Sequence, residues 1–367
     1  MNLWNQNWFD VKINHDYFSL SSRWENLRYF LGQGHVVAHV KDRFKWHFGP
    51  RFFHVFDFPS HVDIETSSLC QMQCPMCGRH LMKKRGIQEG NMEFDLYKKV
   101  IDECVRERVY SVKLSWRGEP LLNPKIVDMV KYAKDSGIKD VSFLTNGERL
   151  NPELSKKLVD VGLDWMSFSI DGLDGTYERI RYPEKFENIV KKVKFLKEYR
   201  DSKVLKKPLI RVQTIWSAIR ENPEKYRNFW LPVADRINFI ADEIRSDEKM
   251  NFIRDPNYIC QSPWQRMAVM WDGRVAQCHS DYLEGNILGD VKEQSLRDIW
   301  HGEAFNRVRD LMKNKRRLKL APCQLCCDGG ITKEEVIKVG NKKIKMNVYI
   351  DQHLDIKSMD ARPKGIK

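Results

Sequence analysis

The chain has 367 residues, of which 42% are hydrophobic and 31% charged, and its formal net charge is +13. This length can bury a large core in more than one domain, and no apolar run approaches the ~20 residues of a membrane span. The first residues lack a basic segment followed by an apolar one, so no signal peptide is expected. Nine cysteines, mostly in closely spaced groups, predict a reducing, cytoplasmic setting.

The excess of basic residues has two interpretations. It can be a solvated basic surface, or it can serve an acidic partner such as a phosphorylated or nucleotide-linked substrate or a nucleic acid. The basic residues are spread along the chain, and their densest run, 313–319, fits a solvated helix face better than a nucleic-acid site. Nucleic acid is therefore not expected as a partner.

The N-terminal segment, residues 1–60, is rich in aromatic side chains that follow no clear period. We predict an extension of the chain that packs on the main domain.

From residue 61 to residue 245, predicted strands alternate with helical patterns. The expected strands are 61–66, 111–116, 141–145, 165–171, 209–216 and 236–241. Apolar stripes or N-terminal prolines indicate helices around 97–105 and at 124–136, 152–162, 185–200 and 223–230. Six βα units predict a parallel sheet with right-handed crossovers, short of the eight units that close a barrel. Functional residues should therefore lie at the C-terminal ends of the strands.

Three cysteines follow the first of these strands at the spacing C-x3-C-x2-C. We call Cys70, Cys74 and Cys77 the first cysteine set. Three thiolates on one loop can hold three irons of a [4Fe-4S] cluster and leave the fourth iron open for chemistry. The alternative is a zinc knuckle with His80 as the nearest further ligand.

This spacing resembles the signature of the radical S-adenosylmethionine (SAM) family. The resemblance implies a partial (β/α)6 barrel and an open iron that binds the amino and carboxylate groups of SAM. One electron then cleaves SAM to methionine and a 5'-deoxyadenosyl radical, which removes a hydrogen atom from the substrate. A flavodoxin- or ferredoxin-type electron donor is implied as a partner. The family usually has an aromatic residue before the third cysteine, against adenine; here Met76 stands there, and its thioether can fill the same space.

The predicted strand ends carry residues similar to the SAM contacts of this family. Arg117-Gly118-Glu119-Pro120 resembles the Gly-Gly-Glu-Pro motif, which holds the amino group of SAM. Gly118 permits close backbone approach, and Glu119 can accept a hydrogen bond from an ammonium group. Arg117 departs from the motif. Later strand ends offer further polar candidates for the ribose and carboxylate of SAM, each of which is alternatively an ordinary turn or capping residue: Asn146, Ser169 and Gln213.

A second group of cysteines lies at 255–330, where the βα alternation stops. Asp272-Gly273 predicts a two-residue hairpin between Cys260 and Cys278, and a C-x2-C pair follows. The spacing C-x12-G-x4-C is similar to the opening of the SPASM domain. Because no cysteine follows Cys327, the resemblance implies a shortened, twitch-like domain with one auxiliary [4Fe-4S] cluster. Its ligands form what we call the second cysteine set: Cys260, Cys278, Cys323 and Cys326. A structural zinc on the same four thiols is the alternative.

Two cysteines lie outside these sets. Cys104 belongs to an apolar helical stripe and is predicted to be buried. Cys327 is a candidate catalytic residue, because its thiol can return a hydrogen atom to a substrate radical. It can also replace Cys326 as a ligand or have no role. Residues 336–367 are predicted to be a basic tail with one hairpin around Gly340-Asn341.

The resemblances predict a barrel domain at 61–245, an auxiliary cluster domain at 255–330, and a radical SAM enzyme acting on a sugar, cyclitol or similar small polar metabolite. An auxiliary cluster that exchanges an electron with a substrate radical favours dehydrogenation, and a thiol donor allows epimerisation instead. One alternative is a maturase that modifies a ribosomal peptide; another is a zinc-stabilised nucleic-acid-binding protein without SAM chemistry. The expected partner is a small-molecule substrate, which the charge of +13 allows to be anionic, or a peptide.

Overall fold

A ten-stranded sheet forms the centre of the computed structural model, which describes residues 17–243, 245, 253–350 and 359–362. Six of its strands are parallel and neighbour one another in chain order. These strands are β2 (His61–Ile64), β3 (Ser111–Lys113), β4 (Asp140–Thr145), β5 (Trp165–Ser169), β6 (Leu209–Ile215) and β7 (Arg236–Ile240). The prediction of six parallel βα units, a partial barrel, is confirmed.

Both edges of the parallel core are extended by other parts of the chain. β1 (Tyr17–Ser19) pairs antiparallel with β7, and β8 (Arg266–Val269) pairs parallel with β2. Beyond β8, the strands β9 (Arg274–Ala276) and β10 (Ile287–Asp290) continue antiparallel. The cysteine-rich region is therefore hydrogen-bonded to the strand that precedes the first cysteine set.

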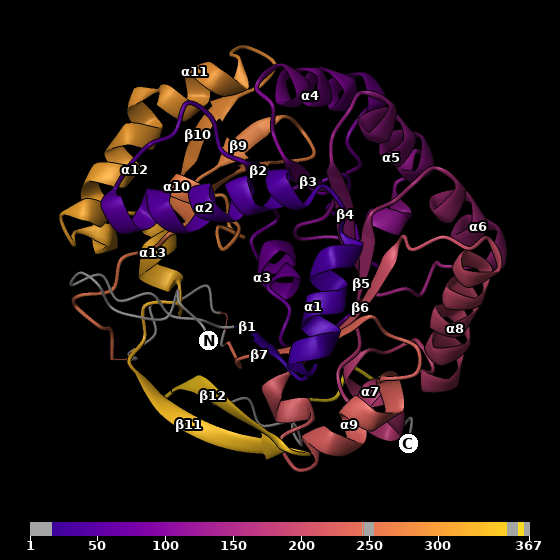
Figure 1. The fold of residues 1–367 in the computed structure, drawn as a ribbon. Helices are drawn as coiled ribbons and strands as arrows, with labels where there is room; N and C mark the ends of the chain where they lie inside the picture. The colour runs from indigo at the N-terminus through magenta and orange to yellow at the C-terminus, as the bar shows by residue number, and fades with distance from the viewer. Residues whose placement is uncertain (1–16, 244, 246–252, 351–358, 363–367) are drawn as a thin grey trace.

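Helices surround the sheet, as Figure 1 shows. The outer ring contains α4 (Phe94–Arg106), α5 (Ile126–Asp135), α6 (Pro152–Asp160), α7 (Asp174–Ile180), α8 (Phe186–Ser202) and α9 (Pro223–Trp230). In this view α1 (Arg23–Gly32), α2 (Val36–Phe52) and α3 (Arg79–Lys84) lie across the ring. The cysteine-rich region adds α10 (Ser262–Gln265), α11 (Leu296–His301), α12 (Glu303–Lys313) and α13 (Ala321–Leu325).

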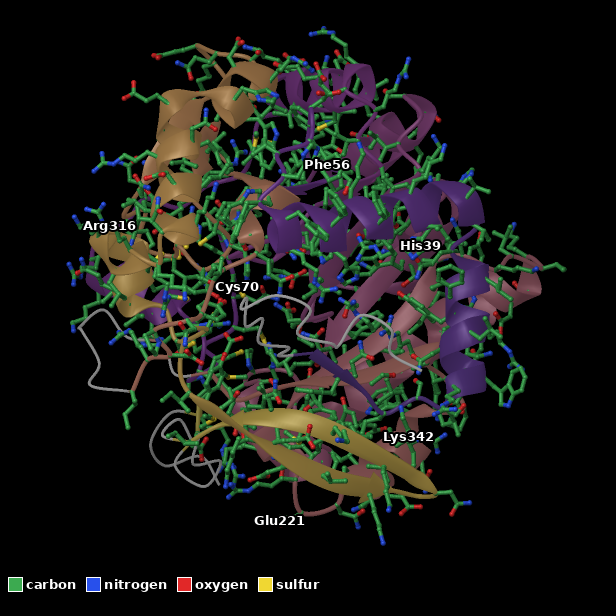
Figure 2. The ribbon with its side chains drawn as sticks, turned by 60° about the vertical axis from the view of Figure 1, so that its left-hand side comes forward. His39, Phe56, Cys70, Glu221, Arg316 and Lys342 are labelled. Carbon is green, nitrogen blue, oxygen red and sulfur yellow. The ribbon has the colours of Figure 1, made fainter. Side chains whose placement is uncertain are left out.

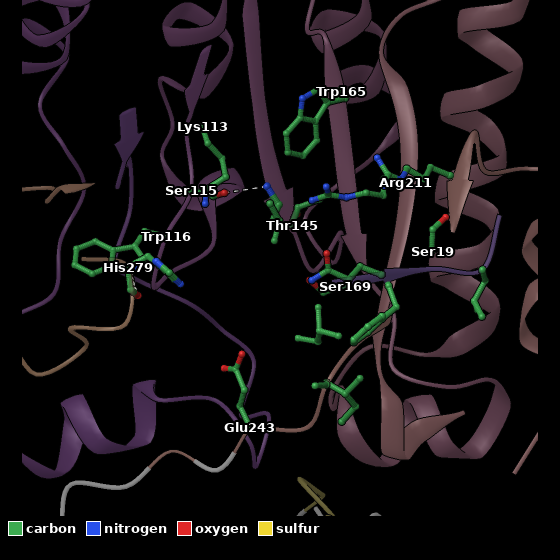
Figure 3. A pocket seen from close by; sticks show the side chains of 18 of the residues that line it. Ser19, Lys113, Ser115, Trp116, Thr145, Trp165, Ser169, Arg211, Glu243 and His279 are labelled. Atoms are coloured by element: carbon green, nitrogen blue, oxygen red, sulfur yellow. Dashed lines mark hydrogen bonds between the residues drawn. The ribbon is translucent and has the colours of Figure 1, made fainter. Parts of the chain in front are cut away.

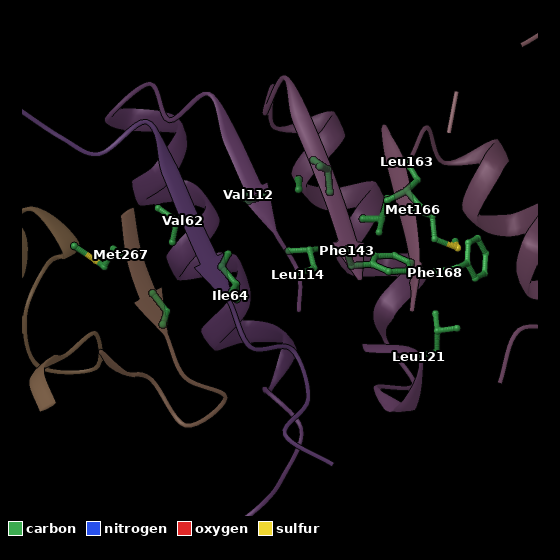
Figure 4. Packing of buried hydrophobic residues seen from close by; sticks show 14 of the residues in the cluster. Val62, Ile64, Val112, Leu114, Leu121, Phe143, Leu163, Met166, Phe168 and Met267 are labelled. Atoms are coloured by element: carbon green, nitrogen blue, oxygen red, sulfur yellow. The ribbon is translucent and has the colours of Figure 1, made fainter. Parts of the chain in front are cut away.

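The period of two in the strands separates the core from the barrel lumen. On β5, Met166 and Phe168 point outward and are fully buried in the core, which Figure 4 shows in part. Their neighbours Trp165 and Ser169 line a cavity in the lumen instead. Cys104 lies in the outer core with 0% exposure, as predicted. The lumen is therefore the place where polar side chains of the strands point, whereas the apolar side chains pack against the helices.

Several strands end earlier than their residue composition predicts. The strand predicted at 111–116 stops at Lys113, and the one predicted at 165–171 stops at Ser169. After β3, Ser115 and Trp116 line the cavity; after β5, the Ile170 N–H still donates to the Gln213 carbonyl at 2.8 Å.

The predicted hairpin at Asp272-Gly273 exists, but its turn is longer than two residues. Gly273 N–H donates to the Met270 carbonyl at 3.0 Å, and Gly273 has φ +97°. This is a four-residue turn that ends in a left-handed glycine, a geometry that favours glycine over other residues.

The C-terminal segment forms a separate two-stranded hairpin, β11 (Thr332–Val339) and β12 (Lys342–Tyr349), whose turn is at the predicted Gly340-Asn341. Figure 2 shows Lys342 near its tip. The Lys342 ammonium donates to the carbonyls of Ser19 and Ser21, at 2.9 and 2.5 Å. The tip thereby docks beside β1. Across the described ranges, the helices are too short or too polar to cross a membrane.

Candidate active site

A large cavity of about 2770 Å³ occupies the barrel lumen and its open side. Its walls come from the strands, from the loop after β2, from α1 and α2, and from the tip of the β11–β12 hairpin. Figure 3 shows lining side chains that reach into it from several strands, with Glu243 at its lower edge. Glu119, Asn146, Ser169, Gln213, Met76 and Gly118, the residues predicted to contact SAM, all line this cavity.

The first cysteine set is assembled at the mouth of this cavity. All three of its thiols line the cavity wall. Burial, with a smaller effect of the neighbouring thiols, raises the pKa of Cys74 to about 12, while the Arg181 guanidinium opposes them. Burial also raises the pKa of Cys70. Three neighbouring thiols that repel one another as thiolates fit a polynuclear cationic group that replaces their protons.

The loop that carries these thiols is held by contacts that other residues make to its backbone. Arg79 donates to the carbonyls of Ser68 and Cys70, at 3.0 and 2.8 Å. A Cβ on Gly118 would lie 2.3 Å from the Ser67 carbonyl oxygen, so only glycine fits there. The adjacent Glu119 N–H donates to the Leu69 carbonyl at 2.7 Å. Gly118 and Arg79 therefore clamp the cysteine loop from two sides.

Glu119 sits at the centre of this arrangement. Its carboxylate accepts hydrogen bonds from the Thr145 hydroxyl at 2.6 Å and the Asn146 backbone N–H at 2.7 Å. Burial nevertheless raises the pKa of Glu119 to about 7. A cationic ligand such as an ammonium group would favour its ionised form.

Two side chains donate toward the sulfurs of the first set. The Asn146 side-chain amide lies 3.6 Å from the Cys70 sulfur, and Arg181 lies 3.5 Å from the Cys74 sulfur. Arg181 is positioned by Asp171 at 2.6 Å. The sequence pointed to Asn146 for a different reason and missed Arg181, because no local pattern sets this arginine apart from its neighbours.

The second cysteine set lines a small cavity that adjoins the large one, and Cys260 lines both. All four of its thiols contribute to the wall. Burial raises the pKa of Cys323 to about 12, and it also raises that of Cys278, as do the Cys260 and Cys323 thiols beside it. The Gln277 side-chain amide donates to the Cys323 sulfur at 3.2 Å. Four partly or fully buried cysteines with a sulfur-directed donor fit a fully ligated iron-sulfur cluster.

Zinc fits both cysteine sets less well. Tetrahedral thiolates on zinc lie about 3.8 Å apart at a Zn–S distance near 2.3 Å. In the described part of the chain, the one group of three metal-ligating side chains whose ligand atoms all lie within 4.8 Å of one another is Glu243, Cys327 and Asp328. His80 is exposed and turns its ring toward the Cys77 carbonyl. In neither cysteine set do three ligand atoms lie as close together as zinc ligands do.

Comparison with known proteins identifies the family. The Radical SAM superfamily profile matches residues 64–217. The chain therefore contains a radical SAM domain. The profile of an iron-sulfur cluster-binding domain, SPASM, matches residues 260–328. The two domains imply [4Fe-4S] clusters and SAM as cofactors.

Relatives of this radical SAM protein have several described roles. The tungsten-containing aldehyde ferredoxin oxidoreductase cofactor-modifying protein of Pyrococcus furiosus is 25% identical over 323 residues, which cover 73% of this chain and 88% of that protein. The SAM-dependent 2-deoxy-scyllo-inosamine dehydrogenase of Niallia circulans is 22% identical over 280 residues, which cover 75% of this chain and 96% of that protein.

Among solved structures, Streptococcus suis SuiB bound to its precursor peptide SuiA has a similar fold. Its TM-score is 0.53 at 16% identity, and the match covers 85% of this chain and 78% of that chain.

Arg117, which departs from the family motif, connects the radical SAM and SPASM domains. Its guanidinium makes two contacts of 2.8 Å with Glu65, after β2. The same group contacts Glu284 at 2.9 Å and the Tyr282 carbonyl at 3.2 Å. Trp116 beside it donates to the His279 carbonyl at 2.6 Å. Arg117, which stands where the family motif has its first glycine, thus forms a buried bridge between the two domains.

Cys327 lies next to Cys326 of the second cysteine set, and the two thiols interact electrostatically. Cys327 is 5% exposed and is not among the residues that line either cavity. Its sulfur belongs to the group with Glu243 and Asp328, both of which line the large cavity. The thiol therefore lies behind the wall rather than on it.

Proposed function

We propose that this radical SAM enzyme dehydrogenates an alcohol carbon of a small polar metabolite, a sugar or a cyclitol. The observation that carries the proposal is the position of Cys327. A thiol that lies behind the cavity wall is poorly placed to return a hydrogen atom, whereas the second cysteine set suits an electron acceptor. The match to a cyclitol dehydrogenase over 96% of its length supports the same reading.

In this proposal the chain divides as its motifs suggest, with the barrel at 61–245 and the auxiliary domain at 255–330. The two cysteine sets hold one cluster each, and Met76, Gly118, Glu119, Asn146, Ser169 and Gln213 surround SAM. When bound, SAM and the clusters supply a 5'-deoxyadenosyl radical, which takes one hydrogen atom from the substrate carbon, and an acceptor for one electron. The remaining proton, on the hydroxyl oxygen, must go to a base of the protein.

Glu243 is the candidate for that base. Its side chain lines the cavity, on the side where the second domain approaches. Arg245 lies 3.0 Å from its carboxylate and orients it. Burial raises the pKa of Glu243 from its ordinary value, although Arg245 opposes the effect. A carboxylate with a raised pKa at a cavity wall suits proton transfer near neutral pH.

Anaerobic reconstitution tests this function. The wild type should contain roughly eight irons per chain and form 5'-deoxyadenosine from SAM when reduced. A panel of cyclitols and amino sugars should then yield a ketone in a one-to-one ratio with 5'-deoxyadenosine. The triple change of Cys70, Cys74 and Cys77 to Ala should keep roughly four irons and abolish SAM cleavage. Cleavage that survives this change would overturn the assignment of the first set.

A further inference from the structure

The barrel lumen holds a convergent set of cations that the proposed chemistry does not use. Lys113 on β3, Arg211 on β6 and Arg266 on β8 all line the large cavity. Lys113 and Arg211 are visible in Figure 3 among the residues that face this space. Their charges interact, because Arg266 and Arg211 both act with burial to lower the pKa of Lys113. We call these three residues the lumen cations.

Each arginine among the lumen cations is fixed in position. Arg211 donates to the Ser167 hydroxyl at 2.8 Å and lies over the Trp165 ring, 4.4 Å from its centroid. Arg266 lies 4.6 Å from the Trp46 centroid. Because these contacts hold the guanidinium groups before any ligand arrives, binding an anion costs little further ordering.

Two of the lumen cations share one buried carboxylate. Asp63 is fully buried behind the cavity wall and contacts Lys113 at 2.5 Å and Arg266 at 3.3 Å. His61, 3.2 Å from the same carboxylate, has its pKa lowered by burial and by Arg266. Lys113 and Arg266 thus share the single negative charge of Asp63.

Arg266 also has an unused donor. Its Nε–H is buried, and no acceptor lies within hydrogen-bond distance of it among the described residues. A buried donor without a partner is destabilising, so a ligand acceptor at this point is favoured. Phosphate is the group that best fits two guanidinium forks and a lysine on one cavity wall, because it is a dianion with several acceptor oxygens.

We propose that the lumen cations bind a phosphate group on the substrate, so that the substrate class is a phosphorylated sugar or cyclitol; this rests on the proposed function. Gln213 lies two residues beyond Arg211 on the same face of β6, which corresponds to about 7 Å along the strand. The phosphate would therefore sit deeper in the lumen than the reacting carbon, by about the width of one sugar ring. Such an anchor sets which carbon faces the SAM end of the cavity.

Calorimetric titration of the reconstituted, SAM-loaded enzyme with inorganic phosphate tests this inference. Wild type should bind phosphate. Arg211→Gln and Lys113→Gln should each weaken binding at least tenfold, with thermal unfolding checked for both. Lys191→Gln, which removes an exposed cation on α8, should leave the affinity unchanged. Acetate as the second probe should bind at least tenfold more weakly than phosphate.

Three results would overturn the inference: no phosphate binding by wild type, equal binding by both lumen variants and wild type, or acetate binding as tight as phosphate binding. The titration does not depend on turnover. If SAM cleavage fails while phosphate binding follows the lumen cations, the proposed function is wrong and the anion site stands. If a ketone forms from unphosphorylated cyclitols and phosphate does not bind, the function stands and the anion site is wrong.

Discussion

At the scale of single residues, side-chain hydrogen-bond donors around the first cysteine set suit this loop to a cluster. Asn146 and Arg181 direct N–H groups at the sulfurs of Cys70 and Cys74. Hydrogen bonds to ligand sulfurs are one of the means by which a protein sets the reduction potential of a cluster. Arg181 brings a positive charge as well, and Asp171 holds that charge in place.

Sequence could identify part of this environment and not the rest. The cysteines and Gly118-Glu119 are recognisable because their spacing is local and chemically constrained. Arg79, Arg181 and the lumen cations could not be found this way, because they are isolated basic residues from distant segments. Their roles arise only when the barrel brings those segments together.

Glu119 gives a prediction about pH. If its carboxylate accepts from the SAM ammonium, SAM should bind more tightly as pH rises through about 7, because the raised pKa keeps Glu119 partly protonated below that point. Glu119→Gln should weaken binding by about 1.5–3 kcal/mol at pH 8 and flatten the pH profile. The measurement is the SAM dissociation constant from pH 6 to 8.5, with Glu153→Gln, an exposed carboxylate on α6, as the control. If the SAM dissociation constant of the wild type shows no transition near pH 7, Glu119 is an ordinary turn residue rather than a SAM contact.

At the scale of elements, sequence periodicity located the strands and the outer helices other than α7, because apolar residues recur along them at a regular spacing. The predicted helix at 223–230 and the observed α9 coincide. The N-terminal helices α1 and α2 were not predicted, because exposed apolar residues such as Trp24 and Val37 blur the contrast between their faces. The end of the strand predicted at 111–116 was overestimated for a different reason: its residues favour a strand, but Ser115 and Trp116 line the cavity instead.

The connection between the barrel and the SPASM domain yields a second prediction. Arg117→Gly restores the usual family motif yet leaves Glu65 buried without its partner. Removal of one member of a buried ion pair costs about 3–5 kcal/mol, so the free energy of unfolding should fall by that amount in urea. Arg297→Ala, which breaks a half-exposed pair with Glu107, should cost less than about 1 kcal/mol. Equal stabilities of Arg117→Gly and wild type would show that Arg117 is not a structural bridge.

At the scale of the whole molecule, the two cysteine sets line adjoining cavities. The first set lines the large cavity, and the second set lines the small one, with Cys260 on the wall of both. Glu243 and Asp328 line the large cavity, and Asp328 also lines the small one. A substrate between the two sets can thus face the SAM end on one side and an electron acceptor on the other, which is the arrangement that a net oxidation needs.

The position of Cys327 separates oxidation from epimerisation. An epimerase must return a hydrogen atom to the opposite face of the substrate radical, and a thiol is a suitable donor because the S–H bond is weak. Cys104 is buried in the outer core, so Cys327 is the remaining thiol outside the two sets.

Since Cys327 lies behind the wall formed by Glu243 and Asp328, we expect Cys327→Ala to keep turnover within about twofold of wild type. In heavy water, the wild-type product should carry no solvent deuterium at the reacting carbon, as judged by mass spectrometry and NMR. Cys104→Ala is the matched control for loss of a free thiol. Deuterium at an inverted carbon that disappears in Cys327→Ala, while SAM cleavage continues, would establish an epimerase and assign Cys327 as its hydrogen donor.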